Sequence, residues 1–201
     1  MQAKEICWNR SVLNAELKDK ANIVDIFVDA FSEDPYFRWL FPTRPLLRFL
    51  FELVVQEMLP YGHIKYAEGG RGAIAALPPE ISFASWIPIS RALKYLIKLG
   101  VISTARVVKM MYLVKDNFPT RDHYYIFSLG TRSLDQGHGI GSVLLRQTLK
   151  CADRHQKLTY LENSNERNLS FYSRHGFELK KQIVLDKKGT SLWLMHREPQ
   201  S

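Results

Sequence analysis

The sequence predicts a single mixed α/β domain, and three observations support this prediction. The chain has 201 residues, of which 46% are hydrophobic and 24% charged, as in an ordinary globular domain with one core. This composition excludes disordered, collagenous and disulfide-stapled classes. The last third alternates short apolar runs, typical of strands, with amphipathic stretches, typical of helices. No internal repeat or low-complexity linker divides the chain, so we expect one domain over residues 1–201.

The first 120 residues predict helices around one short pair of strands. Apolar residues three and four positions apart indicate the helices, and apolar runs on both sides of a glycine-rich cluster indicate a hairpin. The expected elements are a helix over 18–32 ended by Asp34 and Pro35, an aromatic-rich loop over 36–42, a helix from about Leu46 to near Pro60, strands over 64–67 and 73–77, and two helices within 89–118 divided at Gly100.

The remaining residues carry denser regular signals. Apolar runs alternate with helical patterns, and a polar turn separates the last two runs. The expected elements are a strand over 123–129, a helix over 139–155, a strand over 158–162, a helix over 169–175, and strands over 178–185 and 191–196.

The chain is basic, with 28 Lys and Arg against 20 Asp and Glu and a net charge of +8. Such a balance suits an anionic ligand, nucleic acid or an acidic membrane surface, and charge alone does not choose among them. A nucleic-acid module is one alternative, because basic residues recur within 89–118. These charges lack interleaved aromatic residues or a known motif, and they are typical of the solvated face of an amphipathic helix.

The two cysteines, Cys7 and Cys151, fit no CxxC or zinc spacing, so neither a metal site nor a disulfide framework is expected. Residues 1–10 contain no apolar core of a secretory signal, and no stretch reaches the roughly 18 apolar residues that span a bilayer. We therefore expect a cytoplasmic protein without a membrane partner.

A glycine loop lies between an expected strand and a strong amphipathic helix. Glycines let the backbone approach a ligand, and the free amides and dipole of a helix start favour negative charge, as pyrophosphate binding requires. A tight turn without a ligand is the alternative. The residues of the loop are Gln136, Gly137, His138, Gly139, Ile140, Gly141 and Ser142.

Two familiar phosphate loops match this segment poorly. A Walker loop ends in Gly-Lys-Ser/Thr, which is missing. The dinucleotide fingerprint GxGxxG fails at its third glycine, where Ser142 stands, although Glu162 falls where a ribose-binding acid is expected. Only 60 residues follow Gly141, too few for the rest of a doubly wound sheet.

The loop instead resembles that of the GNAT superfamily of acyl-CoA-dependent N-acyltransferases, which reads Gln/Arg-x-x-Gly-x-Gly/Ala. The resemblance covers about 124–198. Residues 30–42 and 77–79 look like the puromycin acetyltransferase branch. The matching residues are Gln136, Gly139, Gly141, Asn165, Tyr172, Gly176 and Phe177.

This resemblance implies a mixed, mostly antiparallel sheet flanked by helices, with an extra helical insertion around 89–118. It also implies acetyl-CoA as the acyl donor, bound mainly by residues 121–201, and an acceptor side formed mainly by residues 1–120. A non-catalytic acyl-CoA sensor with the same loop remains an alternative.

The resemblance further suggests a role for several residues. The segment 136–142 would hold the pyrophosphate, and Leu129, Gly130 and Thr131 would pair with pantetheine, with an amide near Leu129 facing the thioester oxygen. Tyr172 would act as the general acid, or pack as a core aromatic. Asn165 would bond pantetheine or cap the next helix, and Asn168 would contact the cofactor or stay exposed.

The sequence leaves the general base open among several residues. The expected strand 123–131 contains no Asp or Glu, whereas some relatives carry a carboxylate there. Glu162 would act through a water molecule, or form a strand-end salt bridge. His123 and the pair Tyr124 and Tyr125 are weaker alternatives. Both cysteines are poorly placed for covalent catalysis, so we expect direct transfer in a ternary complex.

Clustered aromatic residues in the N-terminal part are candidates for the acceptor pocket, with core packing as the alternative. We expect a small-molecule primary amine as the acceptor and no nucleic-acid partner, and a homodimer is compatible with the sequence. The candidate pocket residues are Tyr36, Phe37, Trp39 and Trp86.

Overall fold

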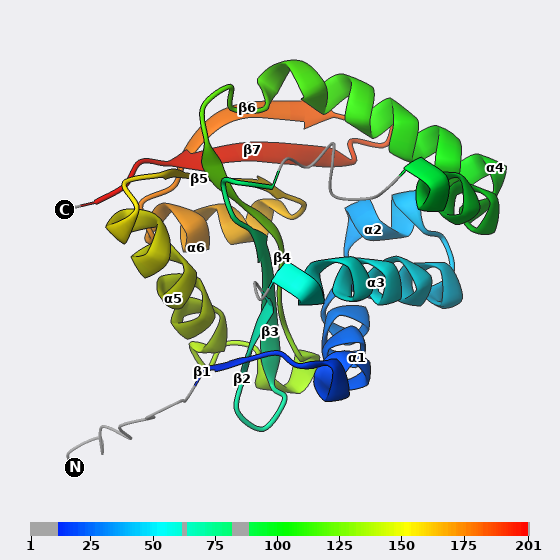
Figure 1. The fold of residues 1–201 in the computed structure, drawn as a ribbon. Coiled ribbons are helices and arrows are strands. Elements are labelled where there is room, and N and C mark those ends of the chain that lie inside the picture. The colour runs from blue at the N-terminus through cyan, green and yellow to red at the C-terminus, as the bar shows by residue number, and fades with distance from the viewer. Residues whose placement is uncertain (1–11, 62–63, 82–88, 201) are drawn as a thin grey trace, which may run out of the picture.

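The computed structural model describes residues 12–61, 64–81 and 89–200. Its centre is a seven-stranded sheet in the order β1-β2-β3-β4-β5-β7-β6 (Figure 1). Only β4 and β5 are parallel neighbours, and the other pairs are antiparallel. The expected mixed, mostly antiparallel sheet flanked by helices is therefore confirmed.

The elements agree closely with those expected. The strands are β1 Val12–Asn14, β2 Ile64–Ala67, β3 Gly72–Leu77, β4 His123–Thr131, β5 Leu158–Asn163, β6 Glu178–Val184 and β7 Ser191–Arg197. The helices are α1 Lys20–Phe31, α2 Pro35–Leu40, α3 Arg44–Met58, α4 Ile89–Val114, α5 Ile140–Arg154 and α6 Leu169–Ser173. In α4, Gly100 has φ 77° and ψ 167°, so two helical segments meet there as expected.

Two elements differ from the expectation. The segment 36–42 was expected to be a loop, but most of it lies in α2. Asp34 begins this helix, because its Oδ1 accepts hydrogen bonds from the amides of Tyr36 and Phe37 at 2.9 and 3.2 Å. Pro35 suits the first turn of a helix. The Asp34–Pro35 pair therefore follows the end of α1 and also begins α2. The strand β1 was not expected, since three residues are too few to show alternation.

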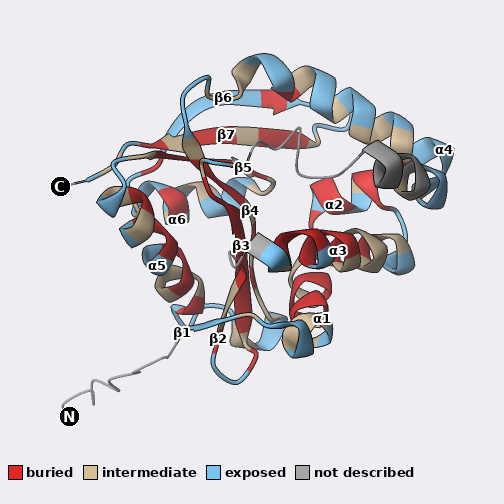
Figure 2. Ribbon diagram, viewed as in Figure 1, coloured by how far each residue is buried: buried red, intermediate tan, exposed pale blue. Residues whose placement is uncertain are grey.

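Helices cover both faces of the sheet, and the central strands feed two apolar cores. Along β3, Ala73, Ala75 and Leu77 face the core shared with α1 and α3, whereas Ile74 and Ala76 face the core shared with α5. Buried residues follow the inner sides of these helices (Figure 2). Both faces of the sheet are shielded from water by helices, which explains the apolar character of the central strands.

The strands β4 and β5 part midway along their length. Their pairing runs from His123 opposite Leu158 to Ile126 opposite Leu161, although β4 continues to Thr131. At the same point, β3 pairs Ala75 with Ser128 and Ala76 with Ile126, so Phe127 is an extra residue in β4. The bulge bends β4 away from β5. Residues Leu129 to Thr131 therefore pair with β3 on one edge of β4, but on the other edge they have no pairing with β5.

Gly130 permits the close approach of α1 to this part of β4. A Cβ at Gly130 would lie 2.9 Å from the Cβ of Ala30 and 3.2 Å from the Phe27 ring. We expect Gly130→Ala to lower the free energy of unfolding by about 1–3 kcal/mol, because extra volume in a packed contact forces a shift. Chemical denaturation measures the loss.

The matched control is the double variant with Ala30→Gly, which removes the nearest atom. It should destabilise the protein by less than the sum of the two single effects. Full additivity, or an unchanged stability of Gly130→Ala, would show that the contact is not tight.

Candidate active site

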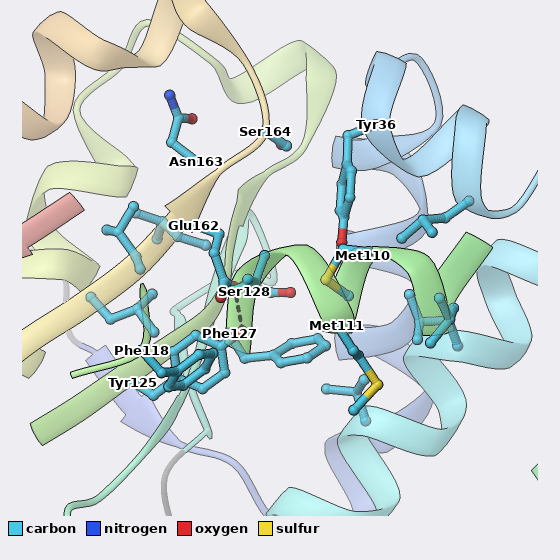
Figure 3. Close-up of a pocket in the computed structure, with 18 of the residues that line it drawn as sticks. Tyr36, Met110, Met111, Phe118, Tyr125, Phe127, Ser128, Glu162, Asn163 and Ser164 are labelled. Atoms are coloured by element: carbon cyan, nitrogen blue, oxygen red, sulfur yellow. Dashed lines mark hydrogen bonds between the residues drawn. The ribbon is translucent and has the colours of Figure 1, made fainter. Parts of the chain in front are cut away.

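A cavity of about 840 Å³ lies where β4 and β5 part. Its walls come from α2, α3 and α4 on one side and from β4, β5 and the segment up to α6 on the other (Figure 3). Expected site residues from both parts of the chain line it, namely Tyr36, Phe37, Leu129, Glu162, Asn168 and Tyr172.

Glu162 is the carboxylate of this cavity that is held by two phenols. Tyr125 donates its hydroxyl to Oε2 at 2.5 Å, and Tyr160 donates to Oε1 at 2.9 Å. The arrangement follows from the sheet, because Tyr160 and Glu162 are two residues apart on β5 and Tyr125 pairs with Tyr160 across the ladder. The three side chains therefore share one face, and Figure 3 shows Tyr125 and Glu162 at the cavity.

Burial controls the protonation of this group. It raises the pKa of Glu162 above the usual range of a glutamate, while the two phenolic hydrogen bonds lower it. Burial and the nearby Glu162 charge raise the pKa values of Tyr125 and Tyr160, so both phenols stay protonated as donors. Among the ion pairs of the described residues, none involves Glu162. Glu162 is thus a carboxyl poised to exchange a proton rather than half of a salt bridge.

Tyr172 lies in α6 and reaches the same cavity as Leu129. Its ring makes edge contacts with Phe171 and Phe177, at centroid distances of 5.1 and 5.7 Å. Burial, and to a lesser extent the charge of Asp34, raise the pKa of Tyr172 above that of an ordinary phenol. The hydroxyl therefore remains a proton donor, and packing and a chemical role are compatible at this residue.

The glycine loop leads into the first turn of α5. Gly137 and Gly139 have φ values of 76° and 77°, a left-handed conformation that glycine adopts without strain. Gly139 is the N-cap of α5, and no side chain caps the amides that follow it. A Cβ at Gly139 would meet nothing within 4 Å, so the loop is open on that side.

These features fit a bound acyl-coenzyme A. Uncapped amides at a helix start suit a pyrophosphate, and the part of β4 beyond the β5 ladder suits an amide-rich pantetheine arm. The loop residues Ile140, Gly141 and Ser142 supply the helix start, and Gln136 lies beside β4, with its Nε2 3.4 Å from the Thr131 carbonyl oxygen. His138 is exposed in the same loop.

The other expected residues have simpler surroundings. Asn165 caps the short helical turn Glu166–Asn168, since its side chain accepts from the Arg167 amide at 3.1 Å. The capping alternative is therefore confirmed. Trp39 is half-buried outside the cavity lining, with the Arg106 guanidinium 5.6 Å from its ring centroid. Trp86 lies outside the described residues.

Sequence reasoning missed other parts of the site. Ser164 donates to Oδ2 of Asp34 at 2.7 Å, which ties the start of α2 to the segment after β5. Met110, Met111 and Phe118 line the cavity from α4 and the segment after it. The helical spacing within 89–118 indicated an apolar face, but only the tertiary structure shows that this face closes the cavity.

Comparisons with known proteins agree with this fold. A family model described as an acetyltransferase (GNAT) domain matches residues 100–179. A solved structure described as histone acetyltransferase HPA2 and related acetyltransferase, from Corynebacterium glutamicum, is 27% identical, with 96% of this chain and 97% of that chain covered and a TM-score of 0.70.

Two insect structures are similar in fold at lower identity. Arylalkylamine N-acetyltransferase 2 from Aedes aegypti is 16% identical over 96% of this chain and 100% of that chain, with a TM-score of 0.71. The polyamine N-acetyltransferase of Drosophila melanogaster, which forms N-acetylagmatine, is 14% identical over 94% of this chain and 100% of that chain, with a TM-score of 0.69.

Among the helices of the described residues, none combines the length and the hydropathy that a membrane span requires.

Proposed function

We propose that this chain, which carries a GNAT acetyltransferase domain and is an acyltransferase using acetyl-CoA, acetylates the primary amine of a small molecule. The observation that supports the proposal most strongly is the shared cavity. It brings together a carboxyl with a raised pKa, Glu162, a protonated phenol, Tyr172, and the β4 residue Leu129. These groups match the needs of direct transfer in a ternary complex.

The proposed reaction begins with the acceptor as an ammonium ion, which must lose a proton before its nitrogen can attack. Glu162 removes a proton from the attacking ammonium group through a water molecule, and the amine nitrogen then bonds to the thioester carbonyl carbon. A main-chain amide near Leu129 donates to the developing oxyanion. When the carbon–sulfur bond breaks, Tyr172 gives its proton to the departing thiolate, and the second proton that the nitrogen loses as the amide forms restores the Tyr172 phenol through solvent. The products are an N-acetylated amine and coenzyme A.

The remaining residues would bind the two substrates. Acetyl-CoA is held at the glycine loop 136–142 and along Leu129, Gly130 and Thr131, with Asn165 and Asn168 beside the pantetheine arm. Residues 121–201 thus form most of the donor side, and residues 1–120 most of the acceptor side. The acceptor would contact Tyr36 and Phe37 in the cavity.

The lining favours an amine with an apolar or flat body. Aromatic and methionine side chains from α2 and α4 line the same cavity as Glu162. A polyamine needs a second carboxylate for its distal ammonium group, yet the other acid of the lining, Asp122, already pairs with Lys157 at 3.0 Å. We therefore favour an alkyl or arylalkyl monoamine over a polyamine.

A panel of amines tests this proposal. Thiol release from acetyl-CoA should be measured with arylalkylamines, alkylamines, polyamines, aminonucleosides and amino acids. We expect the highest kcat/KM for an apolar monoamine, at least about tenfold above the polyamines, since one unpaired ammonium group costs more than a kcal/mol.

Calorimetric titration separates the alternatives. Binding of acetyl-CoA without thiol release from any amine would favour an acyl-CoA sensor. No binding of acetyl-CoA, together with tight binding of NADH, would overturn the proposal in favour of a dinucleotide-binding protein.

A further inference from the structure

The helix α4 carries apolar side chains on its outer side as well as on its inner side. Val101, Val108 and Tyr112 are 86%, 55% and 66% exposed, and spacings of seven and four residues place them on one helix face. Ile102 in the same helical segment and Ile97 in the segment before Gly100 are exposed as well. Single exposed apolar residues are ordinary, but three on one helix face form a patch. We name Val101, Val108 and Tyr112 the outer apolar face.

The opposite side of α4 accounts for its packing. Met110, Val114 and Val107 pack on the core of the domain, and Ser103 is buried. Lys109 donates to the Leu185 carbonyl oxygen at 2.7 Å. The outer apolar face is therefore not a core face left open by a loosely placed helix. Val101 and Tyr112 lie outside the cavity lining, whereas Val108 is exposed and also lines the cavity, and Figure 2 shows much of α4 exposed.

The charge of α4 has one sign. Its 26 residues include five Lys or Arg and no Asp or Glu. Lys98 is exposed, and so is Lys109 although it bonds to Leu185. Lys115 and the exposed Asp116 follow directly, with the Lys115 Nζ 4.3 Å from the Tyr112 ring centroid. A helix with apolar residues, cations along its sides and no acid is typical of helices that lie in the interface of an anionic bilayer.

Other occupants fit this surface less well. A second copy would bring two helices of the same positive charge together, with no carboxylate on α4 to compensate. A nucleic acid offers phosphates to the lysines, but its backbone leaves the outer apolar face without an apolar partner. An anionic bilayer offers both kinds of partner in one plane.

We propose that α4 docks the protein on the surface of an anionic lipid bilayer, with Val101, Val108 and Tyr112 entering the headgroup region. The expectation of no membrane partner rested on the lack of a spanning segment, which an interfacial helix does not need. Val108 also lines the cavity, so docking would place that wall of the cavity at the lipid surface. This last consequence rests on the proposed function, because it concerns the access of apolar amines, which partition into lipid. Docking itself does not rest on the proposed function.

Vesicle co-sedimentation of the full chain tests docking without any assay of activity. We expect binding to vesicles of phosphatidylcholine mixed with phosphatidylglycerol, weakening as salt is added. Val101→Asp should weaken this binding about tenfold, because it replaces an aliphatic group that docking would bury by a charge of the same sign as the lipid. Val101→Ser should weaken it less. The matched control is Leu17→Asp, which places the same charge at an exposed leucine outside α4.

Three results would overturn docking. The first is no binding of the wild type to the anionic vesicles, and the second is equal binding by Val101→Asp and the Leu17→Asp control. The third is a wild-type dimer in analytical ultracentrifugation that Val101→Asp converts to a monomer without any change in vesicle binding. That result would assign the outer apolar face to a second copy. Circular dichroism of each variant confirms that the fold is retained.

Discussion

Glu162→Gln is expected to lower kcat with the best amine by about 100-fold or more at neutral pH, because the amide keeps the shape of the side chain but cannot accept the proton. The structure provides the reason, since Tyr125 and Tyr160 hold the carboxyl in place and burial raises its pKa. Steady-state thiol release measures the loss. The matched control is Glu178→Gln, an exposed glutamate of β6 paired with Lys180.

Stability distinguishes this effect from unfolding. A carboxyl whose pKa is raised in the folded state is protonated more readily there than in the unfolded chain. Its contribution to stability therefore falls as the pH rises from the unfolded pKa through the folded pKa. At neutral pH, Glu162→Gln should thus be as stable as the wild type or more stable, while losing activity. A variant that keeps most of its kcat would show that Glu162 is not the base.

The pH profile gives a second readout of the same group. In the wild type, kcat should rise with pH as Glu162 ionises, and the midpoint should lie above the usual range of a glutamate. Tyr160→Phe removes one of the two hydrogen bonds that lower this pKa, so the midpoint should move to higher pH. A midpoint that moves to lower pH would contradict the described geometry.

Tyr172→Phe is expected to lower kcat by about 100-fold, with little change in the binding of acetyl-CoA, since only the proton donor to the thiolate is lost. The ring keeps its contacts with Phe171 and Phe177, so the fold should be retained. Rapid measurement of thiol release and calorimetric titration of acetyl-CoA together test both parts of the expectation.

The control for Tyr172 is Tyr124→Phe. Tyr124 is also a buried tyrosine, but its hydroxyl is 2.8 Å from Nδ1 of His155 and it lies outside the cavity lining. The Tyr124→Phe variant should retain nearly all of the wild-type kcat. Undiminished turnover of Tyr172→Phe would mean that another group protonates the thiolate.

Much of the fold could be predicted because its strongest signals are local. The amphipathic spacing of α5 and the apolar runs of β4 and β5 follow from burial of one or both faces, which short windows reveal. The segment around Asp34 shows the limit of such reasoning. The same Asp-Pro pair follows one helix and starts the next, and only the hydrogen bonds of Asp34 show the second role.

The site was predictable only in part, for a physical reason. The glycine loop and Tyr172 lie within one continuous segment, so their spacing carried a signal. The hydrogen bond of Tyr125 to Glu162 depends on the register of β4 against β5, which no local pattern encodes, whereas Tyr160 and Glu162 share a face because they are two residues apart on one strand. The closure of the cavity by α4 depends likewise on packing between segments far apart in the chain.

The central claim is acetyl transfer from acetyl-CoA to a small primary amine within a ternary complex. It is tested most directly by initial velocities at varied acetyl-CoA and amine, with the product identified by mass spectrometry. We predict intersecting double-reciprocal lines and an N-acetylated amine formed in equal amount to coenzyme A. Parallel lines, or coenzyme A released without an acetylated amine, would contradict it.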